Sequence, residues 1–149
     1  MMRWLGVLLL LMLAVPTGAT PAAEPDRYAE GQVWEYRTRP QDAGSLIKIQ
    51  RIEDGGKIGR IYHVSIIGLS FAGASPGKSL LVHCPVSRQT LDASVTKRSD
   101  VQRDWPDMTA GIAEWRAANG GVFTIGIAEI VTILETTMSR GAPKSGGTT

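Results

Sequence analysis

The chain has 149 residues, of which 43% are hydrophobic and 20% charged, and its formal net charge is +2. This length suits one domain, because domains usually contain about 100–150 residues. The ordinary composition excludes wholesale disorder and collagen-like or coiled-coil architectures. The small net charge argues against a nucleic-acid-binding protein, which would need a strongly basic surface.

The first 23 residues follow the plan of a secretory signal peptide. A positive start at Met1–Arg3 precedes twelve uncharged, leucine-rich residues, Trp4–Val15, and small residues follow at Ala19–Ala23. Twelve helical residues rise about 18 Å, which is too short for a hydrocarbon core of about 30 Å. We therefore expect cleavage after Ala22 or Ala23, export to the periplasm or the medium, and no stable membrane span in the mature protein.

The first half of the mature chain is predicted to form strands. Trp34 and Tyr36 alternate with charged residues, as in a strand with one buried face. Asp54–Gly56 is typical of a hairpin turn. Pro85 is expected to end the last of these strands, because proline lacks a backbone N–H donor. The predicted strands are Gln32–Thr38, Ser45–Ile52, Ile58–Leu69 and Ser79–Cys84.

The second half favours helices. Asn119–Gly121 is a stop signal for the second of them, and Val122–Ile125 is expected to be a short strand. Three segments carry apolar residues at helical spacing: Leu91 and Val95 within Ser87–Arg98; Met108, Ile112 and Trp115 after Pro106; and Ile127, Ile130, Val131, Leu134 and Met138 near the C-terminus.

This order of elements predicts an α+β fold. We expect an antiparallel sheet of about four to five strands with the C-terminal helices packed on one face, and a small half-open β-barrel with helices is the alternative. The globular domain should span residues 24–138. Residues 139–149 contain three glycines, a proline and no large apolar side chain, so a disordered tail is expected there.

Cys84 is the single cysteine, so the chain cannot form an internal disulfide after export. Burial is its expected role, since free cysteine is among the most buried residue types, and a reactive thiol or an intermolecular crosslink are the alternatives. A catalytic site would combine Cys84 with His63 or His83. However, His83 and Cys84 are adjacent, and adjacent side chains of a strand point to opposite faces. The sequence contains few metal-ligating side chains and no closely spaced pair of them on a helix, so neither a metal site nor a cofactor is predicted.

The segment Ala72–Ser79 fits a relaxed spelling of the phosphate-binding loop of nucleotide-binding proteins, with Lys78 and Ser79 in the functional positions. That loop must be followed by a helix whose N-terminus faces the phosphates. The residues after Ser79 favour a strand instead. A nucleotide site is therefore not predicted.

The aromatic residues offer one candidate binding surface. Trp34 and Tyr36 share a face of their predicted strand, and core packing is the expected explanation because each aromatic ring buries a large apolar area. The alternative is a platform for a ligand or partner formed by Trp34, Tyr36 and Trp105.

The order of several short motifs resembles a group of small exported bacterial proteins of unknown function. The resemblance spans residues 31–135 and implies one compact exported domain, without implying a substrate, cofactor or catalytic residue. The motifs are Gly31–Arg39, Ile61–Ile66, His83–Ser87, Ser94–Lys97 and Gly121–Ile125.

No set of residues in the sequence satisfies the geometric needs of an active site. We therefore expect an exported, non-catalytic binding or interaction protein, such as an envelope accessory or an inhibitor, whose partner is a protein or a small molecule. The alternative is an envelope hydrolase or a thiol-dependent enzyme that uses Cys84 with His63 or His83.

Overall fold

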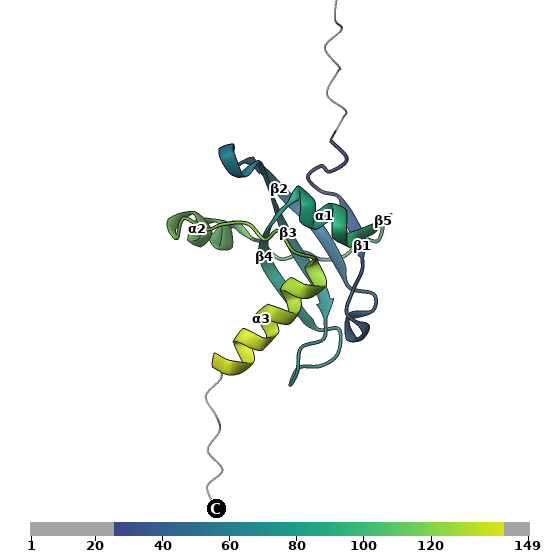
Figure 1. The fold of residues 1–149 in the computed structure, drawn as a ribbon. Coiled ribbons are helices and arrows are strands. Elements are labelled where there is room, and N and C mark those ends of the chain that lie inside the picture. Colours follow the sequence, from purple (N-terminus) through teal and green to yellow (C-terminus); the bar gives the residue numbers. More distant parts are fainter. Residues whose placement is uncertain (1–25, 142–149) are drawn as a thin grey trace, which may run out of the picture.

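A computed structural model describes residues 26–141, in which five strands form one antiparallel sheet in the order β4-β3-β2-β1-β5 (Figure 1). The predicted leader and the last eight residues lie outside the described part. The α+β class predicted from the sequence is confirmed. The strands are β1 Val33–Tyr36, β2 Leu46–Asp54, β3 Arg60–Leu69, β4 Ser79–Ser87 and β5 Val95–Ser99, and the helices are α1 Arg88–Ser94, α2 Thr109–Ala117 and α3 Ile127–Gly141.

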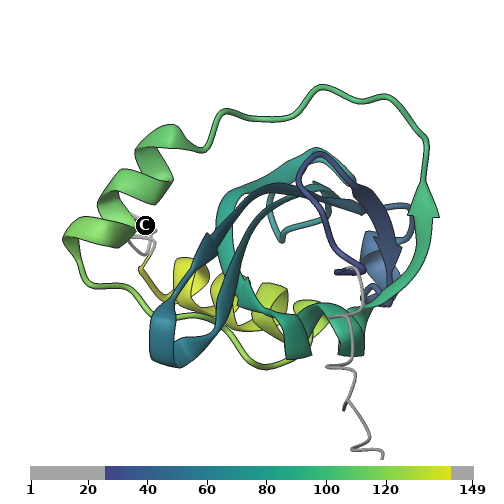
Figure 2. The same ribbon diagram turned by 90° about the horizontal axis from the view of Figure 1, so that it is seen from above.

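The sheet is strongly curled, and its concave side holds the core. Figure 2 shows the strands following an arc, with α1 and α3 lying across the inner side. Alternate residues of each strand point into this core, as the period of two requires. The core includes Tyr28, Trp34, Tyr36, Ile47, Ile49, Tyr62, Val64, Ile66, Cys84, Val86, Leu91, Val95, Ile127, Ile130 and Val131.

The helix predicted over Ser87–Arg98 is wrong in its second half. Helix α1 begins after Ser87, whose side chain accepts a hydrogen bond from the backbone N–H of Thr90 at 3.2 Å, and it ends at Ser94. The chain then becomes extended at Val95 and forms β5 beside β1, with Tyr36 opposite Val95. Pairing with an open sheet edge outweighs the helical spacing of two apolar residues, one of which is β-branched.

Strand β4 does not end at Pro85 as predicted, but continues to Ser87. Pro85 lies opposite His63, and its carbonyl accepts a hydrogen bond from the backbone N–H of Phe123 on the outer side of the strand. The nitrogen of Pro85 points to that same side, so β3 loses no donor. The strand predicted at Val122–Ile125 is reduced to a single bridge between Val86 and Phe123.

One ladder irregularity decides which residues of β4 face the core. Val64 pairs with Cys84 and Ile66 pairs with Leu81, so β4 uses one residue more than β3 over this interval. The extra residue is a β-bulge. It lets Leu81 and Cys84 both contact the core although they are three positions apart along the strand, a spacing that would place them on opposite faces of a regular strand.

Helix α2 lies on the convex side of the sheet, so the helices do not all pack on one face as predicted. Residues 100–108, which we call the strap, run from β5 around the outside of the sheet to α2 (Figure 2). Gln50, the extra residue of a bulge in β2, donates hydrogen bonds to Ser65 Oγ at 2.6 Å and to the carbonyl of Pro106 at 2.9 Å. These bonds tie the strap to the sheet.

Helix α3 extends to Gly141, three residues beyond the predicted end of the domain. Ile127, Ile130 and Val131 of its predicted apolar stripe are buried, whereas Met138 is 49% exposed because the last turns of the helix project past the sheet. No helix within residues 26–141 combines the length and apolar character needed to cross a membrane.

Candidate functional sites

Strands β3 and β4 place His63 and His83 together on the convex face. Nδ1 of His63 lies 2.8 Å from Nε2 of His83, and the two rings stack with centroids 5.0 Å apart. Trp115 of α2 presents its ring edge-on to His63 at a centroid distance of 5.0 Å. His63 is thereby fully buried, with 0% of its surface exposed, beneath α2.

The environment of this pair favours neutral imidazoles. Burial and the neighbouring His83 lower the pKa of His63 to about 4, although the Glu53 carboxylate acts in the opposite direction. Burial likewise lowers the pKa of His83. Nε2 of His63 has no hydrogen-bond partner, and the nearest carboxylate oxygen, Oε2 of Glu53, is 3.8 Å away. Glu53 itself forms an ion pair with Arg116 of α2.

The histidine pair is suited to joining α2 to the sheet and not to chemistry on a substrate. Its two facing nitrogens are occupied by each other, and neither ring lines any of five well-defined cavities within residues 26–141. Glu53 approaches the opposite edge of the His63 ring, so these three side chains do not converge on one ion. Within the described part of the chain, no group of three or more metal-ligating side chains is assembled.

Cys84 lies on the concave face, away from both histidines. Its side chain is 1% exposed and belongs to the core, and burial raises the pKa of the thiol to about 12. Such a thiol is protonated at neutral pH and is not a nucleophile. The structure therefore brings His63 and His83 together and leaves Cys84 on the other side of the sheet.

The three aromatic residues considered as a binding platform are also separated. Trp34 and Tyr36 belong to the core, where the Trp34 ring meets Tyr28 edge-on at 5.6 Å. Trp105 belongs to the strap, and Nζ of Lys48 lies 5.8 Å from the centroid of its ring. These side chains do not share one surface.

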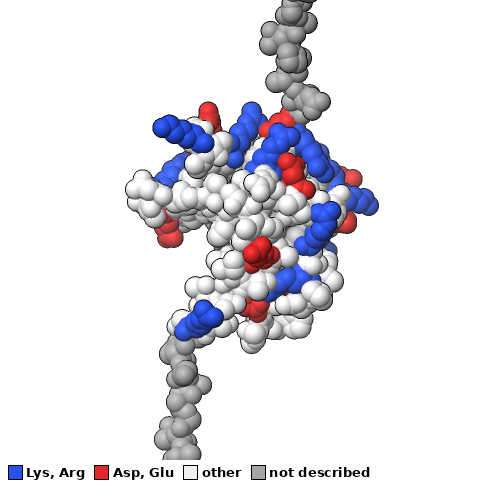
Figure 3. Space-filling view, viewed as in Figure 1, with Lys and Arg blue, Asp and Glu red and all other residues white. Residues whose placement is uncertain are grey.

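Charged side chains do not form a binding surface on the face seen in Figure 3, where Lys and Arg residues are interspersed with Asp and Glu residues around α1. Asp26 illustrates this pattern, because its carboxylate pairs with Arg60 at 2.5 Å and with Arg88 at 3.4 Å. Charges neutralised in this way give no continuous field of one sign.

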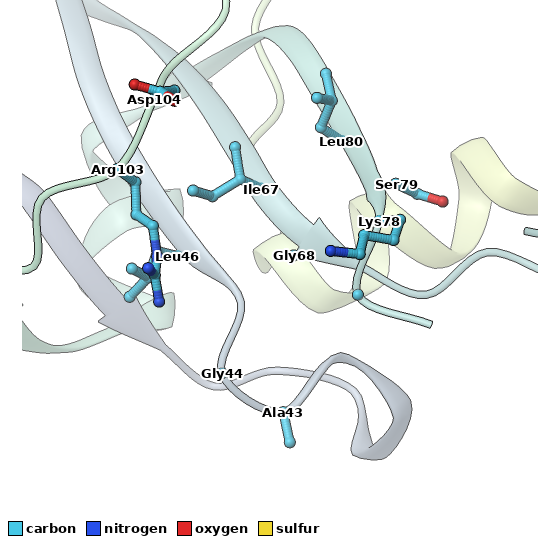
Figure 4. A pocket seen from close by; sticks show the side chains of 11 residues that line it. Ala43, Gly44, Leu46, Ile67, Gly68, Lys78, Ser79, Leu80, Arg103 and Asp104 are labelled. Carbon is cyan, nitrogen blue, oxygen red and sulfur yellow. The ribbon is translucent and has the colours of Figure 1, made fainter. Parts of the chain in front are cut away.

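The most promising cavity lies on the convex face, beneath the strap. It has a volume of about 590 Å³ and is bounded by the strap, β2, β3 and the start of β4 (Figure 4). We call it the strap pocket. Its lining residues are Ala43, Gly44, Leu46, Ile67, Gly68, Gly77, Lys78, Ser79, Leu80, Arg103 and Asp104.

The floor of the strap pocket is a row of three aliphatic side chains. Leu46 pairs with Ile67, and Ile67 pairs with Leu80, so the row crosses β2, β3 and β4 on one face. Residues directly opposite each other in a ladder share a face, with Cβ atoms about 5 Å apart. Exposure increases along the row, from the buried Leu46 to Leu80, which is 44% exposed.

Two cations from distant parts of the sequence border this floor. In Figure 4, Arg103 extends from the strap toward Leu46, and Lys78 extends from the loop before β4 toward Gly68. Neither forms a salt bridge with any carboxylate of residues 26–141. Asp104 also lines the pocket, but in Figure 4 it lies farther along the strap.

The sequence pattern singles out Lys78 only through its likeness to a phosphate-binding loop, and it gives no sign of the strap pocket. The loop at Ala72–Ser79 consists of turns that lead into β4. A strand therefore follows the loop directly, in place of the helix that a phosphate-binding loop needs. Arg103 gives no pattern of its own in the sequence. The pairing register that aligns Leu46, Ile67 and Leu80 also depends on bulges that the sequence does not reveal.

Comparisons with protein-family models, with curated proteins and with solved structures give no match to this chain.

Proposed function

We propose that this protein is an exported, non-catalytic binding module whose ligand or partner occupies the strap pocket. One observation carries the proposal: Lys78 and Arg103, which form no salt bridge within residues 26–141, line a cavity of about 590 Å³. Cys84 and the two histidines, the candidates for a catalytic site, line neither this cavity nor four others within residues 26–141. Concave sites with an apolar floor and a few polar groups are typical of binding pockets.

The apolar leader, with small residues before the expected cut, supports export. The place of action would then be the periplasm or the medium, and the role that of an envelope accessory or an inhibitor. This part of the proposal has its own test. Mass spectrometry of protein recovered from the periplasmic fraction should find a mature N-terminus at Ala23 or Glu24, and recovery of the full-length chain from the cytoplasm would contradict it.

The binding role is tested by capture from an envelope extract that contains both proteins and small molecules. Immobilised wild-type protein should retain a component that neither the Arg103→Glu variant nor the Lys78→Glu variant retains. Lys57→Glu is the matched control, because Lys57 lies in the turn between β2 and β3 and does not line the strap pocket. Retention that is equal for all four proteins would overturn the assignment to this pocket.

The alternative is an envelope hydrolase or thiol-dependent enzyme, and it would need Cys84 beside His63 or His83. The geometry favours the binding role over this alternative, because the thiol is in the core and the imidazoles are on the opposite face. An activity that Cys84→Ala and His63→Ala both abolish, in variants with unchanged circular dichroism, would reverse this preference.

A further inference from the structure

We infer that the ligand of the strap pocket is an amphipathic monoanion, with a carboxylate head and an unbranched apolar tail. This inference rests on the proposed function, since it names the chemical class that the same pocket takes. It follows from three properties of the pocket: its floor, its charges and its walls.

The floor provides a surface for an apolar chain. Leu46, Ile67 and Leu80 form a continuous aliphatic strip across three strands, and two strand spacings make it about 10 Å long. The strip becomes more exposed toward Leu80. Covering exposed apolar surface stabilises a complex by about 25 cal/mol per Å² before the costs of association. A flexible linear tail matches a strip of this shape better than a compact polar molecule does.

The charges select an anionic head and limit its valence. Arg103 provides a planar guanidinium that can donate two parallel hydrogen bonds to a carboxylate, and Lys78 provides a second cation from another segment. Asp104 lines the same pocket, so its three charged side chains sum to +1. A singly charged carboxylate neutralises this sum, whereas a phosphate dianion would leave one negative charge unneutralised in the pocket and would cost more to desolvate.

The walls leave room for the head to enter. Gly44 and Gly68 have φ values of +85° and +78°, which side-chain-bearing residues adopt at a cost, and both line the pocket. A Cβ atom at Gly44 would meet nothing within 4 Å, so the pocket is open there, whereas one at Gly68 would meet the backbone of Ser45 at 3.2 Å. The aliphatic strip leads from Leu46, beside Arg103, toward Leu80 (Figure 4).

Decanoate, used below its micelle-forming concentration, is the probe that tests the inference. Isothermal titration calorimetry should give saturable binding of decanoate and at least about tenfold weaker binding of decanol, which lacks the charge. Acetate and inorganic phosphate lack the tail and should also bind at least about tenfold more weakly. Decyltrimethylammonium should not compete with decanoate.

Variants locate the binding. Arg103→Ala and Lys78→Ala should each weaken decanoate binding by about tenfold, and Lys57→Ala should leave it unchanged. Leu80→Asn should abolish binding, whereas Ile133→Asn, at a position 46% exposed on α3, should not. The substitution at Leu80 leaves the charge of the pocket unchanged, so its effect on the apolar strip is separated from the charge effects of Arg103→Ala and Lys78→Ala.

The outcomes distinguish this inference from the proposed function. Absence of decanoate binding, or binding that Arg103→Ala and Lys78→Ala leave unchanged, overturns the amphipathic-anion class. If an envelope component still depends on Lys78 and Arg103 for capture in that case, the binding module stands and its ligand belongs to another class. If capture is also insensitive to both residues, the proposed function fails with the inference.

Discussion

Nδ1 of His63 and Nε2 of His83 lie 2.8 Å apart across the β3–β4 ladder, under the edge of the Trp115 ring. One nitrogen must donate a hydrogen and the other must accept it, so at least one imidazole is neutral. Glu53, Arg51 and Arg116 are the charged groups around the buried ring. The pair therefore couples the attachment of α2 to the protonation state of two histidines.

Folding stability should fall between pH 6.5 and pH 4.5. The pKa of His63 is lowered to about 4 in the folded protein, mainly by burial, while an unfolded chain takes up this proton near pH 6.5. The contribution of the neutral His63 to the free energy of unfolding is complete above pH 6.5 and is lost as the pH falls toward 4. The total loss is up to about 3 kcal/mol. Urea unfolding at pH 7.5, 5.5 and 4.5 measures the slope.

His63→Gln is the matched comparison for that slope. The variant is less stable at pH 7.5, but its stability should depend less on pH over the same interval, because the depressed group is gone. The carboxylates with lowered pKa values, Asp26, Asp107 and Glu135, act at lower pH and do not produce this difference. Equal slopes for the two proteins would contradict the assignment to His63.

Gly111→Ala should destabilise the protein by about 1–3 kcal/mol, although alanine is the better helix former. A Cβ atom at this position would lie 2.8 Å from Cβ of His83, so α2 would have to move away from the sheet. Gly141→Ala at the end of α3 meets nothing within 4 Å and should change stability by less than about 1 kcal/mol. Thermal unfolding of both variants checks this, and equal effects would contradict the close approach of α2.

Cys84 should resist alkylation in the folded protein. The thiol is 1% exposed and its pKa is raised to about 12 by burial, so both access and thiolate content are low at pH 8. Iodoacetamide should therefore label the protein at the rate of unfolding and should label it rapidly in urea. Rapid stoichiometric labelling without denaturant would disprove the core position.

Arg39→Met should destabilise the protein by about 3–5 kcal/mol. Arg39 pairs with Asp42 and with Glu135 of α3, each at 2.5 Å, and Asp42 is 1% exposed. Removing the guanidinium leaves a buried carboxylate without its counter-ion. Arg37→Met is the control, because the exposed Arg37 donates to the carbonyl of Ala93, and its loss should cost about 1 kcal/mol or less. Urea unfolding that ranks the two variants equally would refute the role of the buried pair.

Local patterns in the sequence predicted the elements whose partners are close along the chain. The hairpin of β2 and β3 follows from two β-rich segments around Asp54–Gly56, and the core-facing part of α3 follows from its apolar stripe. The errors at Ser87–Arg98 and Pro85 have a common cause. In both places the outcome depends on a sheet edge contributed by distant residues, and pairing at that edge overrides the local preference.

The geometry of the sites also depends on pairing between residues that are distant in the sequence. His63 and His83 become neighbours only when β4 is in register with β3, and α2 covers them only because the strap crosses to the convex face. Alternation within one strand correctly separates His83 from Cys84, but it cannot say which of the two enters the core.

The irregularity in β4 has a consequence for changes in the length of this strand. Leu80 and Val82 point outward before it, whereas Cys84 and Val86 point inward after it, so even positions change sides within one strand. Strand β4 thus contains one spare residue. Loss of Val82 would merge the two halves into a single uninterrupted alternation and turn no other side chain over, whereas loss of Pro85 would invert half of the strand.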